Sequence, residues 1–164
     1  ALTIAELLAA TPTATRRLYF SEVISDPRDP ESPTDFYITV DGAAPTVYSM
    51  EDAPAIVTSQ GAVEDWVIEN RAEEIHVFHI HQVHFLAIEA DGVPVPASDL
   101  RLQDVIQLAY WNLSRPVPSV RLRMDFTAIT VGTFLYHCHI LGHEDGGMMA
   151  KIQVLPPAAV AQLP

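Results

Sequence analysis

The stretch YHCHILGHEDGG, Tyr136 to Gly147, holds the single cysteine of this 164-residue chain, Cys138, between two histidines. Thiolate sulfur and imidazole nitrogen are the ligands that soft and borderline metal ions prefer. A lone histidine on a strand usually fills a half-buried polar position, but clustering of all the histidines, partly around the one thiol, predicts metal binding. The two clusters are His76, His79, His81 and His84, and then His137, His139 and His143.

Two metals suit these donors. Zinc accepts cysteine and histidine, but the C-x₂-C and H-E-x-x-H spacings of common zinc sites are missing. Copper is better supported, because two histidines and a thiolate with a weak axial methionine form the blue-copper electron-transfer site. Met148 follows His143 by five residues and is the candidate axial ligand.

Strand geometry distributes these donors between two faces. Side chains alternate along a strand, so Cys138 points one way while its two histidine neighbours point the other. In HVFHIH the last two histidines share a face and the first lies on the opposite one. Pairing of the two strands therefore predicts one mononuclear site and half of a multinuclear site. The expected groupings are His76 with Cys138, and His79 and His81 with His137 and His139.

The elements that position these donors are short and extended. Eight runs rich in Val, Ile, Phe, Tyr and Trp are separated by Pro, Gly, Asp and Ser, and the chain has 13 prolines. Such a pattern predicts an all-β antiparallel sandwich or barrel. A 49% hydrophobic composition is sufficient for one core. The runs are 17–24, 35–42, 63–70, 77–90, 104–112, 119–128, 133–140 and 150–156.

The ends of the chain carry different signals. Thr3 as N-cap with Glu6 three residues later predicts a short helix over 3–9. We expect 1–16 to be a linker with this helix, 17–155 to be the domain and 156–164 to be a tail. Trp66 and Trp111 are expected in the core, and Glu64 and Asp65 on the surface.

Charge excludes one class of partner. The net charge is -12, with only nine Lys and Arg, which argues against nucleic acid because the phosphate backbone favours basic surfaces. No apolar run reaches the ~18–20 residues of a membrane span, so no membrane partner is expected. One cysteine cannot form an intrachain disulfide.

The histidine motifs also carry a family resemblance. HVFHIHQVHF and HCHILGHEDGGMM are similar to the copper motifs H-x-x-H-x-H and H-C-H-x-x-x-H-x-x-x-x-M in the C-terminal cupredoxin domain of multicopper oxidases. The HEDxxMM ending resembles the bacterial spore-coat laccase and bilirubin oxidase branch. The resemblance extends from about Arg17 to Leu155. It implies a cupredoxin-like Greek-key β-sandwich or barrel that forms the third domain of a laccase-like oxidase.

The resemblance also implies roles for single residues. His84 matches no ligand position, and Met149 is expected in the core. Glu144 is implied to deliver protons for oxygen reduction. The implied copper ligands are His76, Cys138 and His143 with axial Met148 for type 1, His79 for type 2, and His81, His137 and His139 for the type 3 pair.

The implied chemistry needs more than this domain. A small one-electron donor reduces the type 1 copper, the electron passes through the Cys138 sulfur to His137 or His139, and O₂ is reduced to water at a three-copper cluster. That cluster takes eight histidines in the family, and residues 1–75 contain none. We therefore expect missing N-terminal cupredoxin domains, or a second copy of this chain, to complete it, and no O₂ reduction by the chain alone. The family suggests an extracellular or periplasmic location.

Two other interpretations remain open. A stand-alone blue-copper electron-transfer cupredoxin needs only the type 1 ligands, and it leaves the other four histidines unexplained. A metal-free sandwich that serves as an interaction module treats every ligand match as coincidence. The sequence does not identify the reducing substrate, because substrate-binding loops vary freely on one fold.

Overall fold

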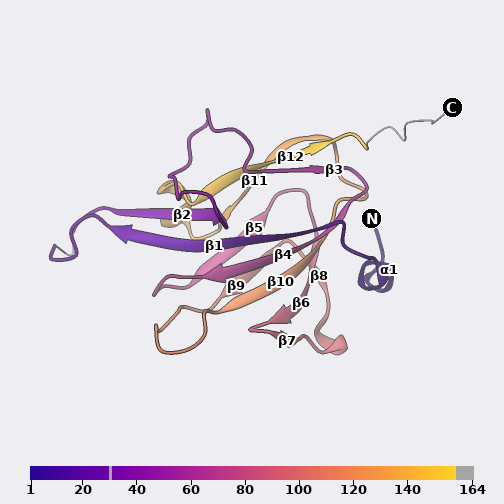
Figure 1. Ribbon diagram of the computed structural model, residues 1–164, viewed down its shortest axis with the longest axis horizontal. Coiled ribbons are helices and arrows are strands. Elements are labelled where there is room, and N and C mark those ends of the chain that lie inside the picture. Colours follow the sequence, from indigo (N-terminus) through magenta and orange to yellow (C-terminus); the bar gives the residue numbers. More distant parts are fainter. Residues whose placement is uncertain (30, 158–164) are drawn as a thin grey trace.

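The computed structural model describes residues 1–29 and 31–157 and shows two β-sheets packed face to face (Figure 1). This confirms the predicted all-β sandwich with a short N-terminal helix. The elements are α1 (Ile4–Ala9), β1 (Ala14–Ile24), β2 (Thr34–Val40), β3 (Ile56–Ser59), β4 (Val63–Asn70), β5 (His76–Ile80), β6 (Phe85–Ala90), β7 (Val93–Pro94), the 3₁₀ helix η1 (Ala97–Asp99), β8 (Leu102–Gln103), β9 (Val105–Leu108), β10 (Ser119–Asp125), β11 (Gly132–Cys138), α2 (Leu141–Asp145) and β12 (Met149–Leu155).

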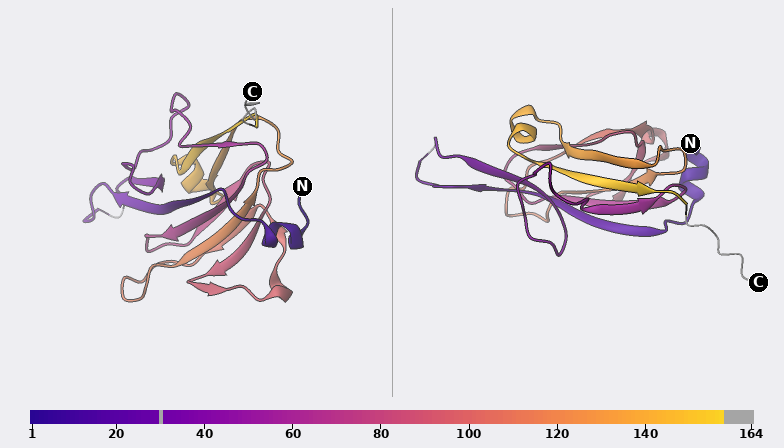
Figure 2. Two further views of the ribbon diagram at one scale, coloured as in Figure 1. Left: turned by 45° about the vertical axis from the view of Figure 1, so that its right-hand side comes forward. Right: turned by 90° about the horizontal axis from the view of Figure 1, so that it is seen from above.

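The two sheets draw on strands from the whole chain. One has the order β2-β1-β4-β10-β6-β7, with β8 paired to β6, and the other has the order β3-β12-β11-β5-β9. Most pairs are antiparallel, as predicted, but β1 with β4 and β12 with β3 run parallel. Parallel neighbours require a long crossover connection. The views of Figure 2 place α1 at the end of the sandwich opposite the projecting β1–β2 turn.

Several elements differ from the sequence prediction. The run 77–90 is two strands in different sheets, because the chain turns at Gln82, which has a positive φ of 63°. β3 and α2 were not predicted, since each is only four or five residues long and has no distinct pattern. β1 begins before the expected domain boundary at residue 17. The expected tail 156–164 lies mostly outside the described residues.

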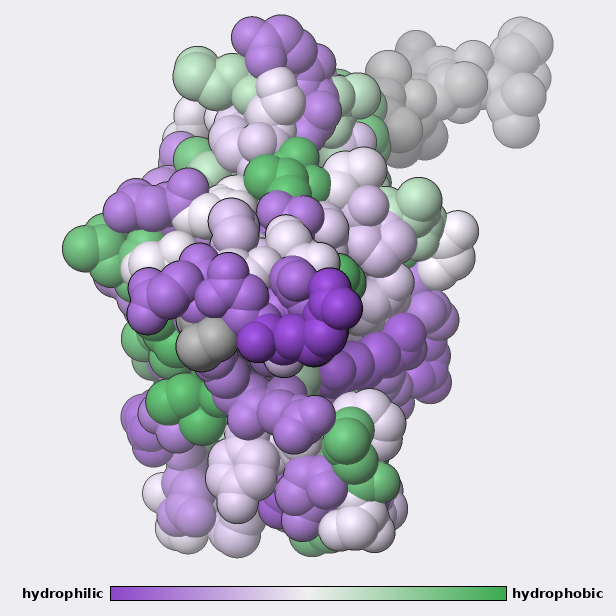
Figure 3. Space-filling view, turned by 90° about the vertical axis from the view of Figure 1, so that its left-hand side faces the viewer, coloured by the Kyte–Doolittle hydropathy of each residue, from purple (hydrophilic) through white to green (hydrophobic). Residues whose placement is uncertain are grey.

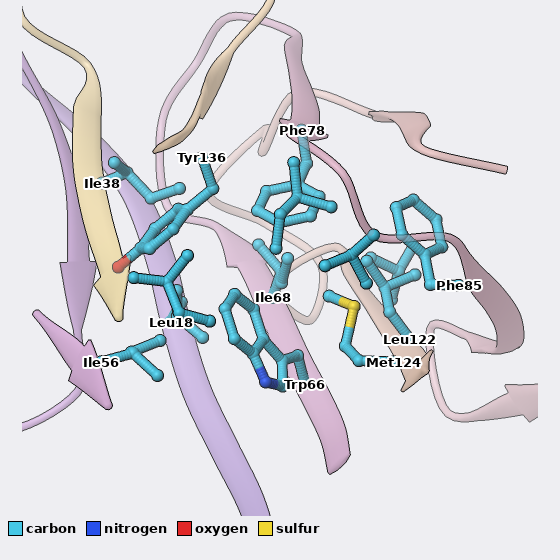
Figure 4. Close-up of a cluster of buried hydrophobic side chains, with 14 of the residues drawn as sticks. Leu18, Ile38, Ile56, Trp66, Ile68, Phe78, Phe85, Leu122, Met124 and Tyr136 are labelled. Carbon is cyan, nitrogen blue, oxygen red and sulfur yellow. The ribbon is translucent and has the colours of Figure 1, made fainter. Parts of the chain in front are cut away.

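The core fills the space between the sheets (Figure 4). Trp66 of β4 is fully buried, as predicted, and contacts the ring of Tyr136 from the facing sheet edge-on, with centroids 5.5 Å apart. Trp111, also predicted in the core, is only half-buried, because it lies in the connection between β9 and β10. Burial of each large aromatic side chain contributes about 2–3 kcal/mol. Tyr136 lies on the same face of β11 as Cys138, so the core holds one face of the metal-binding strand in place.

The predicted surface position of Glu64 and Asp65 is wrong, since their exposed fractions are 2% and 4%. Each carboxylate is paired with an arginine from a neighbouring strand. Arg16 donates two hydrogen bonds to Glu64 (3.0 and 2.9 Å), and Arg123 donates two to Asp65 (2.8 and 3.1 Å). Sequence alone did not show this burial, because the partners come from β1 and β10.

The N-terminal helix is confirmed, together with its capping box. Thr3 accepts from the amide of Glu6, whose carboxylate accepts from the amide of Thr3 at 2.8 Å. Leu7 is fully buried against Val63 and Leu86, so α1 packs onto the sandwich. Neither this helix nor any other described one has the length and apolarity needed to span a membrane.

The end of the sandwich that carries the β1–β2 turn is mainly hydrophilic, with hydrophobic side chains in small separate patches (Figure 3). Arg28 in this turn forms an ion pair with Asp26 (2.9 Å) in which the arginine side chain is 89% exposed. An exposed pair of this kind contributes only about 0–1 kcal/mol. The Arg28–Asp26 pair therefore serves as an exposed reference for the stability that the buried ion pairs of Glu64 and Asp65 contribute.

Candidate metal centres

Three donors meet at one point between the ends of the strands. Cys138 ends β11, His76 begins β5 and His143 lies in α2. The Cys138 Sγ atom is 3.7 Å from the Nδ1 atoms of both histidines, and these two nitrogens are 3.1 Å apart. Donors at these separations can share one ion at the ~2.0–2.3 Å bond lengths of nitrogen and sulfur ligands. The side chains are buried, as a closed site requires.

The strand register produces this arrangement. In the β11–β5 pair, Cys138 lies opposite Phe78 and His137 lies opposite His79. His76 is two residues from Phe78, so it shares the face of Cys138 diagonally across the pair. The amide of Val77 donates to the Cys138 Sγ atom at 3.4 Å. The structure thus brings together His76 and Cys138, whose side chains are predicted to lie on one face from the alternation along their strands.

Two phenylalanines from the other sheet hold the imidazoles in position. The Phe20 ring stacks on His76, with centroids 4.9 Å apart, and the Phe36 ring stacks on His143, at 4.3 Å. Each ring pair is nearly parallel, at 21° and 19°. The sequence indicates only that both phenylalanines lie in strands, because no local pattern connects them with the histidines.

Burial sets the protonation of these donors. It lowers the pKa of His76 to about 3, with a further contribution from His143, so the imidazole is neutral and can offer a lone pair. Burial raises the pKa of the Cys138 thiol, which outweighs the hydrogen bonds from backbone amides. The thiolate therefore needs a nearby cation. Among residues 1–29 and 31–157, the buried Nε2 atom of His76 finds no hydrogen-bond partner.

The expected axial residue, Met148, lies next to this group. It is fully buried, its carbonyl accepts from the amide of Cys138 (3.0 Å), and its amide donates to the carbonyl of His143 (3.0 Å). Met149 is half-buried and pairs with His137 in the β11–β12 ladder. The turn between α2 and β12 therefore brings Met148 beside the cysteine and the histidine.

Gly147 makes this turn possible. Its φ is +91°, and a Cβ atom at this position would collide with the side chain of Val47. We expect Gly147→Ala to lower the free energy of unfolding by about 2–3 kcal/mol. Gly92→Ala is the matched control, because Gly92 has a similar φ of +77° and open space around it. Chemical denaturation measures both, and equal losses in the two variants would contradict the predicted collision.

A second group of imidazoles lies on the opposite face of β11 and β5. Donor atoms of His79, His81 and His137 all lie within 4.8 Å of one another, and the Nε2 atoms of His81 and His137 are 3.1 Å apart. The His139 ring lies 5.1 Å from the His79 ring. His137 is buried and His139 is exposed, so this cluster lies at the surface of the five-stranded sheet.

Backbone carbonyls orient the imidazoles of this second cluster. The Nδ1–H group of His79 donates to the carbonyl of Asp104 (2.9 Å), and that of His137 donates to the carbonyl of Cys138 (3.0 Å). The Nε2 atoms are then left as acceptors for a cation. Burial lowers the pKa of His81, and the neighbouring imidazoles of His137 and His79 lower it further. Asp104 was missed because its contribution is a backbone atom.

Two other candidate residues, Glu144 and His84, differ in how they lie relative to the two donor groups. Glu144 lies in α2 directly after His143, yet its Oε2 atom is 3.4 Å from the Nδ1 atom of His137. The carboxylate is therefore next to the second cluster. His84 is exposed and belongs to neither group of donors, as expected.

Comparisons with known proteins agree on one family. Residues 27–158 match the family model described as "Multicopper oxidase". "Multicopper oxidase mco" of Staphylococcus aureus is 38% identical over 96 residues, which cover 56% of this chain and 20% of that protein. A "Laccase" of Haloferax volcanii is 34% identical over 116 residues, which cover 69% of this chain and 19% of that protein. The chain thus spans about a fifth of the length of these relatives.

Solved structures show the same similarity. The multicopper oxidase from Campylobacter jejuni, described as a metallo-oxidase, is 27% identical, with a TM-score of 0.68 over 90% of this chain and 31% of that one. A multicopper oxidase from Pediococcus acidilactici is 26% identical, with a TM-score of 0.63 over 96% of this chain and 28% of that one. The sandwich is therefore the cupredoxin-like fold of these oxidases.

Proposed function

Because this chain belongs to the multicopper oxidase family, we propose that it is the C-terminal copper-binding domain of a laccase-like oxidase. The observation that carries the proposal is the pair of donor groups on opposite faces of one strand, His76, Cys138 and His143 on one side and the imidazole cluster on the other. The family is one of copper oxidases, and the donor set of the first group is that of a blue-copper site.

The first group would hold the type 1 copper, with Met148 as the axial ligand. The imidazoles of His76 and His143 and the thiolate of Cys138 supply the required donors, and the stacked phenylalanines limit ring movement. Copper bound there supplies one-electron redox chemistry at a potential set by its ligands and their surroundings. The peptide bonds of Cys138 connect this site directly with His137 and His139, which gives the electron a short covalent path.

The second group would hold half of the oxygen-reducing cluster, with His79 at the type 2 position and His81, His137 and His139 at the type 3 positions. Oxygen reduction to water consumes protons, and Glu144 would deliver them because its carboxylate lies 3.4 Å from His137. A stand-alone electron-transfer protein would use only the first group. The converging Nε2 atoms of His81 and His137 therefore favour the oxidase domain.

Completion of the second cluster needs another protein surface. His139 is exposed, and so is Val105, which lies opposite His79 on β9. We propose that N-terminal cupredoxin domains cover this face and add four imidazoles, after which a small electron donor and O₂ can react. A second copy of this chain is the alternative occupant. Light scattering with and without copper tests whether a second copy covers this face. A chain that stays monomeric with copper contradicts this alternative.

Copper content and the visible spectrum test the proposed site. We expect the chain to bind one copper tightly and to show an intense band near ~600 nm. A chain that binds copper without this band, or that binds none, would contradict a type 1 site. Sustained O₂ reduction by the chain alone would overturn the proposal that the second cluster is incomplete.

A further inference from the structure

His143 has a partner on its second ring nitrogen. Its Nδ1 atom faces His76 and Cys138, whereas its Nε2 atom lies 3.2 Å from the Oε2 atom of Glu74. Since a carboxylate accepts only, this close contact favours a proton on Nε2 and leaves Nδ1 free as the donor to a metal. The Glu74 side chain is 58% exposed, whereas the His143 side chain is only 10% exposed.

The loop that carries Glu74 is fixed by a buried side chain. Asn70, which is fully buried at the end of β4, donates to the carbonyls of Glu74 (2.7 Å) and Ala109 (2.9 Å) and accepts from the amide of Ala72 (3.1 Å). All polar groups of the Asn70 side chain are therefore used to hold the connection between β4 and β5. Glu74 thus meets His143 from a defined backbone position.

We propose that Glu74 is a positioning residue for His143: it fixes the tautomer and the ring orientation and increases electron donation from Nδ1. The proposal rests on the copper site proposed above. A carboxylate that contacts the outer ring nitrogen of a ligand imidazole raises the basicity of the ligand. Greater basicity stabilises oxidised copper more than reduced copper, so Glu74 lowers the reduction potential of the site.

Three variants separate the effect of the Glu74 contact with His143 from the effect of the Glu74 charge. Glu74→Ala removes both the contact with His143 and the charge, Glu74→Gln keeps an acceptor oxygen without the charge, and Glu73→Gln is the matched control. Glu73 is the neighbouring exposed carboxylate, and no contact joins it to His143 in the described part of the chain. Thermal unfolding of each copper-loaded variant establishes that the fold is retained.

The main measurement is the redox titration of the copper-loaded chain. For Glu74→Ala we expect about a tenfold lower ratio of oxidised to reduced copper at a fixed potential, which is a rise of about 59 mV for one electron. Glu74→Gln is expected to show a smaller rise, and Glu73→Gln less than a twofold change in the ratio. Equal shifts in Glu74→Ala and Glu73→Gln, or no shift in Glu74→Ala, would overturn the proposal.

A second measurement does not depend on copper. Long-range ¹H–¹⁵N spectra of the metal-free chain should show the proton of His143 on Nε2, with a resonance that persists in Glu74→Gln and is lost or shifts in Glu74→Ala. An unchanged His143 signal in Glu74→Ala would contradict the positioning role. If the wild-type chain binds no copper while Glu74→Ala still shows the expected NMR change, the proposed function is refuted and the contact between Glu74 and His143 is supported.

Discussion

Replacement of Cys138 by serine is expected to abolish the intense ~600 nm absorption of the copper-loaded chain and to lower its copper content by one per chain. The thiolate is the sulfur donor of the first group, and it lies 3.7 Å from both histidine nitrogens. Serine is nearly the same size, so the fold is retained. The oxygen of serine is a harder, weaker donor for copper and cannot give the thiolate band.

The control for this variant is His84→Ala, which removes an exposed histidine that belongs to neither donor group. We expect its copper content and spectrum to match those of the unsubstituted chain. A Cys138→Ser variant that retains the intense band would show that the colour comes from other residues. Equal copper loss in both variants would indicate adventitious binding to surface histidines.

Arg16→Ala is expected to lower the free energy of unfolding by about 3 kcal/mol. Glu64 accepts from Arg16, from the Thr58 hydroxyl (2.7 Å) and from the Trp66 indole (2.9 Å), and its side chain is only 2% exposed. Without Arg16 the carboxylate remains buried next to the core without a counter-charge. For a domain of this size the loss corresponds to a fall in Tm of about 6–12 °C.

A lower pH should reduce the loss of unfolding free energy that Arg16→Ala causes. Burial raises the pKa of Glu64, but the hydrogen bonds from Arg16, Trp66 and Thr58 outweigh it, so the pKa in the folded chain is below the ordinary value of 4.5. The ion pair therefore contributes fully above this value, and its contribution is lost as the pH falls through the lowered pKa. Chemical denaturation at neutral pH and at about pH 3 measures the change.

The matched control is Arg28→Ala, which removes the arginine of an exposed ion pair with Asp26. We expect a loss of about 0–1 kcal/mol. A similar loss for Arg16→Ala would mean that solvent reaches Glu64 and that the buried pair contributes no more than an exposed one. A larger loss for Arg16→Ala at about pH 3 than at neutral pH would contradict the assigned direction of the pKa shift.

The sequence alone determined the donor types, their division between two faces and the all-β fold. These features are local. Alternation along a strand follows from backbone geometry, and the spacing of the histidines and the cysteine in HVFHIH and HCHILGH can be read directly from the sequence. The capping box at Thr3 and Glu6 is local for the same reason. Such signals span a few residues, so they need no knowledge of the partners in space.

Only the tertiary structure decided what surrounds the donors. Phe20 and Phe36 stack on the histidines, Glu74 binds the outer nitrogen of His143, and the carbonyl of Asp104 orients His79. Each contact joins segments far apart in sequence and depends on sheet order and register. The buried position of Glu64 follows from the parallel pairing of β1 with β4. The sequence of one strand does not specify which distant strand pairs with it. These contacts could therefore be identified only from the folded chain.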